Sequence, residues 1–162
     1  MNSLDLSFKT PSGRFNYRVC GIIVDNGRLL TMKDENSEYS YLPGGRVKLC
    51  ETAEEALQRE LCEELTETAS IVRPLYFTES FFNEDTTNED FHEICLYFLV
   101  KLNDEVLTKV PEFTTVDKSF SKLLRFRWID FHDLESEHLY PLFIKREIFS
   151  LPESLQFRTE KE

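Results

Sequence analysis

One amphipathic helix constrains this chain more than any other feature. From about Thr52 to Leu65, the leucines Leu57, Leu61 and Leu65 recur every four positions, which places them on one side of an α-helix. Thr52, followed three residues later by Glu55, is typical of a capping box at a helix start. Because the helix has a single apolar stripe, we expect it to pack on a sheet formed by the strand-like segments around it.

Strand-like segments, rich in β-branched and aromatic residues, lie on both sides of this helix. We expect strands at Phe15–Val24, Arg28–Lys33, Ser70–Phe82, His92–Leu102 and Arg125–Asp130. Asp25-Asn26-Gly27 predicts a tight hairpin between the first two strands. Short helices are expected at Asp130–Leu139 and Pro141–Ser150. Strands, helix, strands and short helices in this order indicate an α+β fold in which a mixed sheet is covered on both faces.

Length and composition indicate a single domain. The chain has 162 residues, and we expect one domain over residues 1–162 with loosely ordered ends at 1–13 and 151–162. Its net charge of −11 argues against a nucleic acid polymer as partner, because phosphate polymers bind to basic surfaces. The four cysteines lack metal-ligand spacing, and no segment has the apolar length of an export signal or a membrane span. We therefore expect a cytoplasmic protein with no membrane partner.

Three glutamates crowd together on the helix beside the leucine stripe. At about 100° per residue, Glu60, Glu63 and Glu64 fall within one arc of the helix surface. Their mutual repulsion destabilises a helix, whereas a divalent cation, which takes several oxygen ligands, changes the sign of that effect. The alternative interpretation is an acidic helix face in contact with water. Gly44 and Gly45 lie just upstream, where exposed backbone can approach the same ligand.

The spacing of these residues resembles the box motif of the Nudix (MutT-like) hydrolase family. The matching positions are Gly45, Glu51, Arg59-Glu60-Leu61 and Glu63-Glu64. Leu42-Pro43-Gly44-Gly45 leads into the motif, and the resemblance extends from about Arg14 to Phe149. The resemblance implies a Nudix-like α/β/α sandwich, with a mixed β-sheet between helices.

The resemblance also implies an activity and a set of site residues. The activity is metal-dependent hydrolysis of a pyrophosphate bond in a nucleoside-diphosphate-linked small molecule, with Mg²⁺ or Mn²⁺ as cofactor. The implied metal ligands are Glu60, Glu63, Glu64 and Gly44. The implied catalytic residues are Glu63, Arg59 and Glu51, the last two by locking the loop and orienting the carboxylates. Candidates for substrate binding are Gly45, Arg46 and Lys48.

Three positions depart from the family pattern. Thr66 and Glu67 replace the glycine and the apolar residue that follow the paired glutamates, and Cys50 stands where many members have glycine. Because glycine usually ends such a helix in a left-handed conformation, we expect the helix exit and the loop geometry to differ here. Every carboxylate of the motif is kept.

Residues outside the motif leave alternatives open. Glu93, beside His92 at a strand start, is either a further base or metal ligand, or a surface carboxylate. Several aromatic side chains either stack on a nucleobase or belong to the core. They are Phe15, Tyr17, Phe81, Phe82 and Phe91. Residues 83–90 are expected to form an acidic, mobile loop.

Three functions follow from these interpretations. The leading hypothesis is a nucleotide pyrophosphohydrolase whose partner is a small-molecule nucleotide. The second is a Nudix-like module that senses a nucleotide without turnover, and the third is an acidic, cation-buffering protein. The sequence leaves the substrate open, with a nucleoside triphosphate favoured by elimination. It also leaves open the oligomeric state, including a homodimer.

Overall fold

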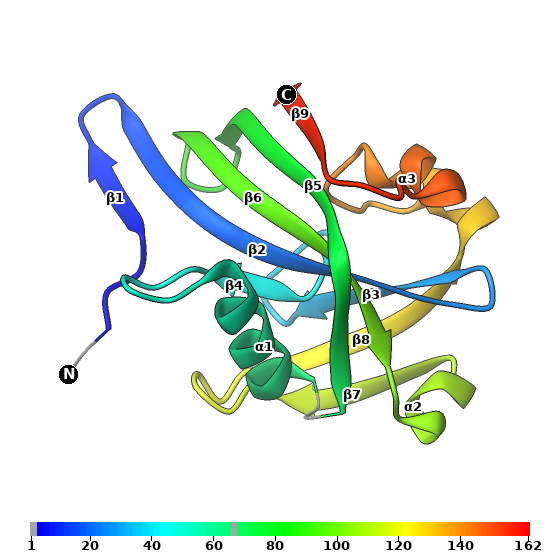
Figure 1. The fold of residues 1–162 in the computed structure, drawn as a ribbon. Coiled ribbons are helices and arrows are strands. Elements are labelled where there is room, and N and C mark those ends of the chain that lie inside the picture. Colours follow the sequence, from blue (N-terminus) through cyan, green and yellow to red (C-terminus); the bar gives the residue numbers. More distant parts are fainter. Residues whose placement is uncertain (1–2, 66–67) are drawn as a thin grey trace.

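A mixed β-sheet organises residues 3–65 and 68–162, the part of the chain that the computed structural model describes (Figure 1). The main path of the sheet has the strand order β7-β8-β3-β2-β6-β5-β9, and β1 and β4 pair with β2. The strands are β1 (Ser7–Thr10), β2 (Gly13–Asp25), β3 (Arg28–Asp34), β4 (Gly44–Arg46), β5 (Ala69–Glu84), β6 (Glu89–Leu102), β7 (Glu112–Val116), β8 (Leu123–Asp130) and β9 (Gln156–Lys161). Two pairs, β2–β6 and β5–β9, are parallel, which makes the sheet mixed as expected.

One regular helix of twelve residues and several short ones accompany the sheet. They are α1 (Ala53–Glu64), α2 (Glu105–Lys109), α3 (Ile144–Glu147) and the 3-10 helices Phe131–Ser136 and Ile148–Ser150. The predicted main helix and the short helices after the last predicted strand are confirmed, whereas α2 and β7 were not expected. In the described part of the chain, no helix has the length and apolar character needed to cross a membrane.

The helices cover both faces of the sheet. On one face, Leu57 and Leu61 of α1 are fully buried in a cluster that includes Val19 of β2. On the other face, Ile144 of α3 is buried in a second cluster that includes Ile22 of β2. Successive residues of a strand point to opposite faces, so β2 contributes to both cores. The expected α/β/α sandwich is therefore confirmed.

Strand β2 is the centre of the sheet and brings distant segments together. The predicted hairpin to β3 is confirmed, and Asn26 and Gly27 have the positive φ values of 47° and 72° that this turn needs. From Arg14 to Ile23, β2 pairs in parallel with β6, so that Arg18 lies opposite Cys95. On its other side it pairs with the short strand β4, which places the glycine loop next to β2 and before α1.

The expectation of loosely ordered ends is wrong for the segments that form strands. Strand β1 pairs with β2 across a turn in which the Thr10 hydroxyl donates to the carbonyl of Gly13 at 3.0 Å. Strand β9 pairs in parallel with β5. Within β9, Arg158 forms an ion pair with Glu147 at 3.1 Å and lies 4.8 Å from the ring centre of Phe143. These contacts join residues that are far apart in the chain, so no local sequence pattern predicts them.

The expected acidic loop at residues 83–90 is mostly a hairpin. Strand β5 continues to Glu84, and β6 begins at Glu89. The side chain of Asn83 donates to Asp90 at 2.9 Å across the two strands. Only the four residues 85–88 remain for the connection, so the prediction of a loop over residues 83–90 is wrong.

Candidate active site

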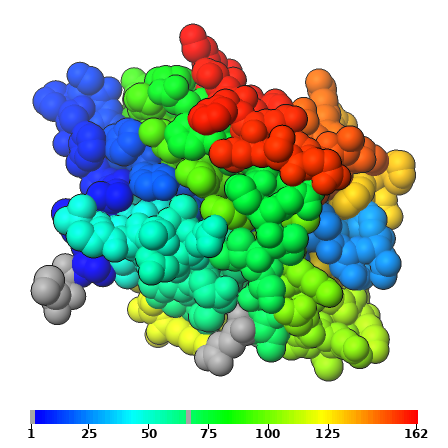
Figure 2. All heavy atoms as spheres, in the orientation of Figure 1, coloured from blue at the N-terminus to red at the C-terminus, as the bar shows by residue number. Residues whose placement is uncertain are grey.

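The local sequence sets the start of α1 and thereby the position of its glutamates. The hydroxyl of Thr52 accepts the backbone N–H of Glu55 at 3.2 Å, and the Glu55 carboxylate accepts the N–H of Thr52 at 2.8 Å. This is the capping box that the sequence predicted, and it satisfies two backbone donors that a helix start leaves open. The loop and helix together form part of the molecular surface, cyan to green in Figure 2.

The glycine pair lets the glutamates of α1 approach the backbone of β4. The N–H of Gly44 donates to Oε2 of Glu64 at 3.2 Å. A Cβ atom on Gly45 would lie 2.3 Å from the carboxyl carbon of Glu60, closer than real Cβ contacts allow. Gly44 itself has a φ of 154°, and a Cβ there would lie 2.1 Å from the carbonyl oxygen of Val19. Both positions therefore require glycine for this arrangement.

Arg59 connects the carboxylates of the motif. Its Nε and Nη2 donate to the two oxygens of Glu51 at 2.7 and 3.0 Å. Its Nη1 donates to Glu60 at 2.6 Å and lies 3.6 Å from an oxygen of Glu63. Nη2 also donates to the carbonyl of Arg46 at 3.1 Å, which joins the helix to β4. One guanidinium thus fixes the loop and two glutamates in a single network.

Burial and neighbouring charges shift the pKa values of these carboxylates in different directions. Hydrogen bonds from Arg59 hold the pKa of Glu51 below its usual value, against the effect of partial burial. Burial raises the pKa of Glu60, although Arg59 opposes that shift. Burial, together with the charge of Glu60, raises the pKa of Glu64 well above its usual value, and this residue is only 7% exposed. The charged forms of Glu60 and Glu64 are thus costly without additional positive charge.

The donor chemistry fits a divalent metal ion, but the side chains do not surround a common point. Among residues 3–65 and 68–162, no three His, Cys, Asp or Glu side chains are arranged to hold one ion. Glu60 is turned toward Arg59, and Glu64 toward the amide of Gly44. Carboxylate and carbonyl oxygens are the ligands that Mg²⁺ takes, and two of these carboxylates are desolvated.

The other predicted site residues lie at the edges of this network. Arg46 lies in β4, and its Nη1 is 3.8 Å from Asp5. The backbone N–H of Lys48 donates to Glu51 at 2.9 Å, so this residue supports the loop through its main chain. Glu93 lies in β6, and its carboxylate accepts the side-chain N–H of Asn16 at 3.3 Å.

The structure adds Arg18, which sequence reasoning missed. It lies in β2 directly opposite Arg46 of β4. Burial lowers its pKa, but the surrounding acidic groups, Cys20 and Glu93 first among them, outweigh this effect and raise it. The feature of the sequence that could have indicated Arg18 is a single cationic residue between the strand residues Tyr17 and Val19.

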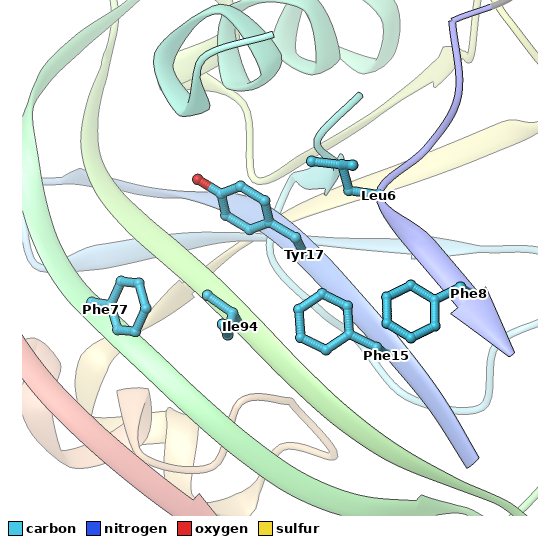
Figure 3. Close-up of a pocket in the computed structure, with 6 residues that line it drawn as sticks. All are labelled: Leu6, Phe8, Phe15, Tyr17, Phe77 and Ile94. Atoms are coloured by element: carbon cyan, nitrogen blue, oxygen red, sulfur yellow. The ribbon is translucent and has the colours of Figure 1, made fainter. Parts of the chain in front are cut away.

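The aromatic candidates divide between a cavity and cross-strand pairs. Phe15 and Tyr17 line an apolar cavity of about 320 Å³ (Figure 3). The remaining residues that line it are Leu6, Phe8, Phe77 and Ile94. Because Tyr17 and Arg18 are successive residues of β2, this cavity lies on the opposite face of the sheet from Arg18. Phe82 and Phe91 stack on each other, with ring centres 5.1 Å apart.

Comparison with known proteins gives the family. The model of the NUDIX domain matches residues 14–149 of the chain. The chain belongs to the NUDIX family. As a NUDIX hydrolase, it acts on phosphoanhydride bonds.

Solved structures support this fold for the NUDIX domain. A NUDIX hydrolase from Nitrosomonas europaea has a TM-score of 0.57 at 16% identity, over 95% of this chain and 82% of that chain. An ADP-ribose pyrophosphatase from Streptococcus suis has a TM-score of 0.58 at 14% identity, over 89% of this chain and 98% of that chain. A MutT protein from Bacillus halodurans has a TM-score of 0.59 at 14% identity, over 90% and 89%. No curated protein matches the chain by sequence.

One departure from the NUDIX pattern is explained by the backbone. Cys50 has a φ of 66°, in the left-handed region that favours glycine and costs other residues about 1–2 kcal/mol. The loop therefore adopts at Cys50 a conformation that a glycine would adopt without strain. The other two departures, Thr66 and Glu67, lie outside the described residues.

Proposed function

We propose that the protein hydrolyses a pyrophosphate bond in a nucleoside-diphosphate-linked small molecule, with Mg²⁺ or Mn²⁺ as cofactor. Membership of the NUDIX family supports the reaction class. The observation that carries the proposal is the approach of two desolvated carboxylates, Glu60 and Glu64, to the backbone of Gly44 and Gly45. Carboxylates placed in this way are stabilised when a cation and a phosphate ester share the site.

The residues of the motif divide into metal ligands and supports. Glu60, Glu63, Glu64 and the carbonyl of Gly44 would hold the ion, which neutralises phosphate charge and lowers the pKa of a bound water. Arg59 and Glu51 fix the loop through the two hydrogen bonds at 2.7 and 3.0 Å. Gly45 and Arg46 lie in β4 and Lys48 in the connection from β4 to α1, where we place the phosphates.

Glu63 is our candidate for the general base. Its carboxylate is 3.6 Å from Arg59, whereas that of Glu60 accepts a hydrogen bond from the same nitrogen at 2.6 Å. The weaker contact leaves the oxygens of Glu63 available to accept a proton from the attacking water. Glu93 is a second candidate, because Asn16 holds its carboxylate in a fixed position on β6.

The proposal is tested with Glu63→Gln and Glu64→Gln. We expect each substitution to lower Mg²⁺-dependent turnover by about 100-fold or more, because each removes a charged ligand or a base. The measurement is release of phosphate or pyrophosphate from a panel of nucleoside triphosphates, ADP-sugars, dinucleotides and capped nucleotides, with EDTA as the metal-free reference. Glu54→Gln is the control, because Glu54 is exposed on the first turn of the same helix.

Two results would contradict the proposal. Unchanged Mg²⁺-dependent turnover in both variants would remove the role of the glutamates. Tight nucleotide binding in calorimetry, with no product released in Mg²⁺ or Mn²⁺, would instead favour a sensing module.

A further inference from the structure

Two arginines face each other on neighbouring strands of the sheet. Arg18 of β2 is the antiparallel partner of Arg46 of β4. Residues directly opposite each other in an antiparallel pair project from the same face, with Cβ atoms about 4.5–5.5 Å apart. Like charges in this position destabilise the pair. The arrangement is therefore costly unless an anion lies between or beside the two guanidinium groups.

The two guanidinium groups have unused hydrogen-bond donors. Within residues 3–65 and 68–162, the side chain of Arg18 forms no hydrogen bond and no ion pair within 4.0 Å. The side chain of Arg46 is 39% exposed and has one weak contact, at 3.8 Å to Asp5. Each guanidinium carries five N–H donors in a planar fork that matches phosphate oxygens. The side chain of Arg18 is half-buried and keeps part of its surface exposed to solvent.

Strand β4 links the two arginines to the proposed metal ligands. The carbonyl of Arg46 accepts a hydrogen bond from Arg59 at 3.1 Å, and the N–H of Gly44 in the same strand donates to Glu64 at 3.2 Å. On the other side, Arg18 lies opposite Cys95 in β6, two residues after Glu93 on the same face. Arg18 thus lies on β2, between the strand that contacts α1 and the strand that carries Glu93.

We propose that Arg18, together with Arg46, binds a phosphate group of the nucleotide substrate next to the metal-binding carboxylates. This inference rests on the proposed function and adds to it the side chains that bind the phosphate on the side away from the metal. The metal neutralises phosphate charge on the side of α1, and the two arginines do so on the side of β2 and β4. Bound phosphate also removes the repulsion between the arginines.

The first test compares Arg18→Met and Arg18→Lys with the wild-type enzyme. Loss of charged hydrogen bonds to a phosphate corresponds to a roughly 10- to 150-fold weaker interaction. We expect Arg18→Met to raise KM for the best substrate by that factor, with a smaller change in kcat. Arg18→Lys keeps the charge but lacks the planar fork of donors, so we expect its KM to lie between those of the wild type and Arg18→Met. Arg125→Met, which changes an exposed arginine of β8, is the control and is expected to match the wild type.

A binding measurement separates this inference from the proposed function. Inorganic pyrophosphate is titrated by calorimetry in magnesium-free buffer, where no turnover is needed. We expect a roughly 10- to 150-fold lower affinity for Arg18→Met and no change for Arg125→Met. If no nucleotide is hydrolysed by the wild type, the proposed function fails, and this titration still decides the role of Arg18.

Magnesium affinity distinguishes a phosphate ligand from a merely structural arginine. Removing a cation near Glu60 and Glu64 leaves Mg²⁺ affinity unchanged or increases it, whereas collapse of the site lowers it. Weaker Mg²⁺ binding by Arg18→Met, or pyrophosphate affinity equal to that of the wild type, would overturn the inference.

Two substrates identify the phosphate. Loss of kcat/KM in Arg18→Met with both a nucleoside triphosphate and ADP-ribose places the arginines at the diphosphate. Loss with the triphosphate alone places them at the terminal phosphate. Wild-type kcat/KM with both substrates overturns the proposal.

Discussion

Replacing Glu64 by glutamine is expected to stabilise the metal-free protein while it removes activity. Glu64 is 7% exposed, and its carboxylate accepts one hydrogen bond, from the amide of Gly44 at 3.2 Å. Glutamine has nearly the same shape and keeps an oxygen for that amide. The substitution therefore removes a buried charge without opening a cavity or losing this hydrogen bond.

The magnitude follows from the charges around Glu64. Glu60 lies one turn earlier on α1, and side chains at this spacing have Cβ atoms about 5–6 Å apart. At that distance, two unit charges repel by about 3 kcal/mol at an effective dielectric constant of 20. Attraction to Arg18 offsets part of this. A net gain of about 1–2 kcal/mol corresponds to a rise in Tm of about 2–8 °C for a chain of 162 residues.

The raised pKa of Glu64 determines how the stability difference between the variant and the wild type changes with pH. The folded-state pKa of Glu64 is raised, so the folded state binds more protons than the unfolded state between the two pKa values. The contribution of Glu64 to stability therefore falls as pH rises from the unfolded value through the folded value. Glu64→Gln carries no charge at this position, so its stability does not fall in this way as pH rises. Its advantage in Tm is expected to be absent below about pH 4 and to grow toward pH 8.

The assay is thermal unfolding in EDTA from pH 4 to pH 8, followed by circular dichroism. The control is Glu54→Gln on the exposed side of the same helix, for which no stabilisation is expected. Saturating Mg²⁺ is expected to reduce the difference in Tm between Glu64→Gln and the wild type, because it stabilises the wild type through the glutamates. A Tm advantage of Glu64→Gln that is absent in EDTA at pH 8, or equal at pH 4 and pH 8, would contradict a costly buried charge at Glu64.

Three further substitutions probe the loop and the helix. Gly45→Ala places a Cβ 2.3 Å from the carboxyl carbon of Glu60, and we expect a loss in kcat of about 100-fold, measured in steady state. Glu51→Gln removes the charged hydrogen bonds to Arg59, so urea unfolding at pH 7 is expected to show a loss of about 1.5–3 kcal/mol. Because the pKa of Glu51 is lowered in the folded state, this deficit is expected to shrink as pH falls through that pKa. Thr52→Ala removes the helix cap and is expected to lower stability by about 1 kcal/mol in the same assay, with activity retained.

Elements that depend on neighbouring residues were predictable from the sequence alone. The capping box of Thr52 and Glu55 acts within one helical turn, and the turn at Asn26-Gly27 depends on the φ values that these residues tolerate. The spacing of the motif likewise fixed which glutamates share one side of α1, because helical geometry is periodic. For this reason the main helix, the first hairpin and the family were predictable from the printed sequence.

The residues that lie opposite these elements were not predictable, because they come from distant parts of the chain. The pairing of β2 with both β4 and β6 brings together Arg18, Arg46 and Glu93, which are 28 or more positions apart in the chain. The order of β1 and β9 likewise depends on long-range pairing and on the ion pair of Arg158. The raised pKa of Glu64 results from burial, which no spacing encodes. Strand order, register and desolvation arise from contacts between distant segments, and these form only when the whole sheet is assembled.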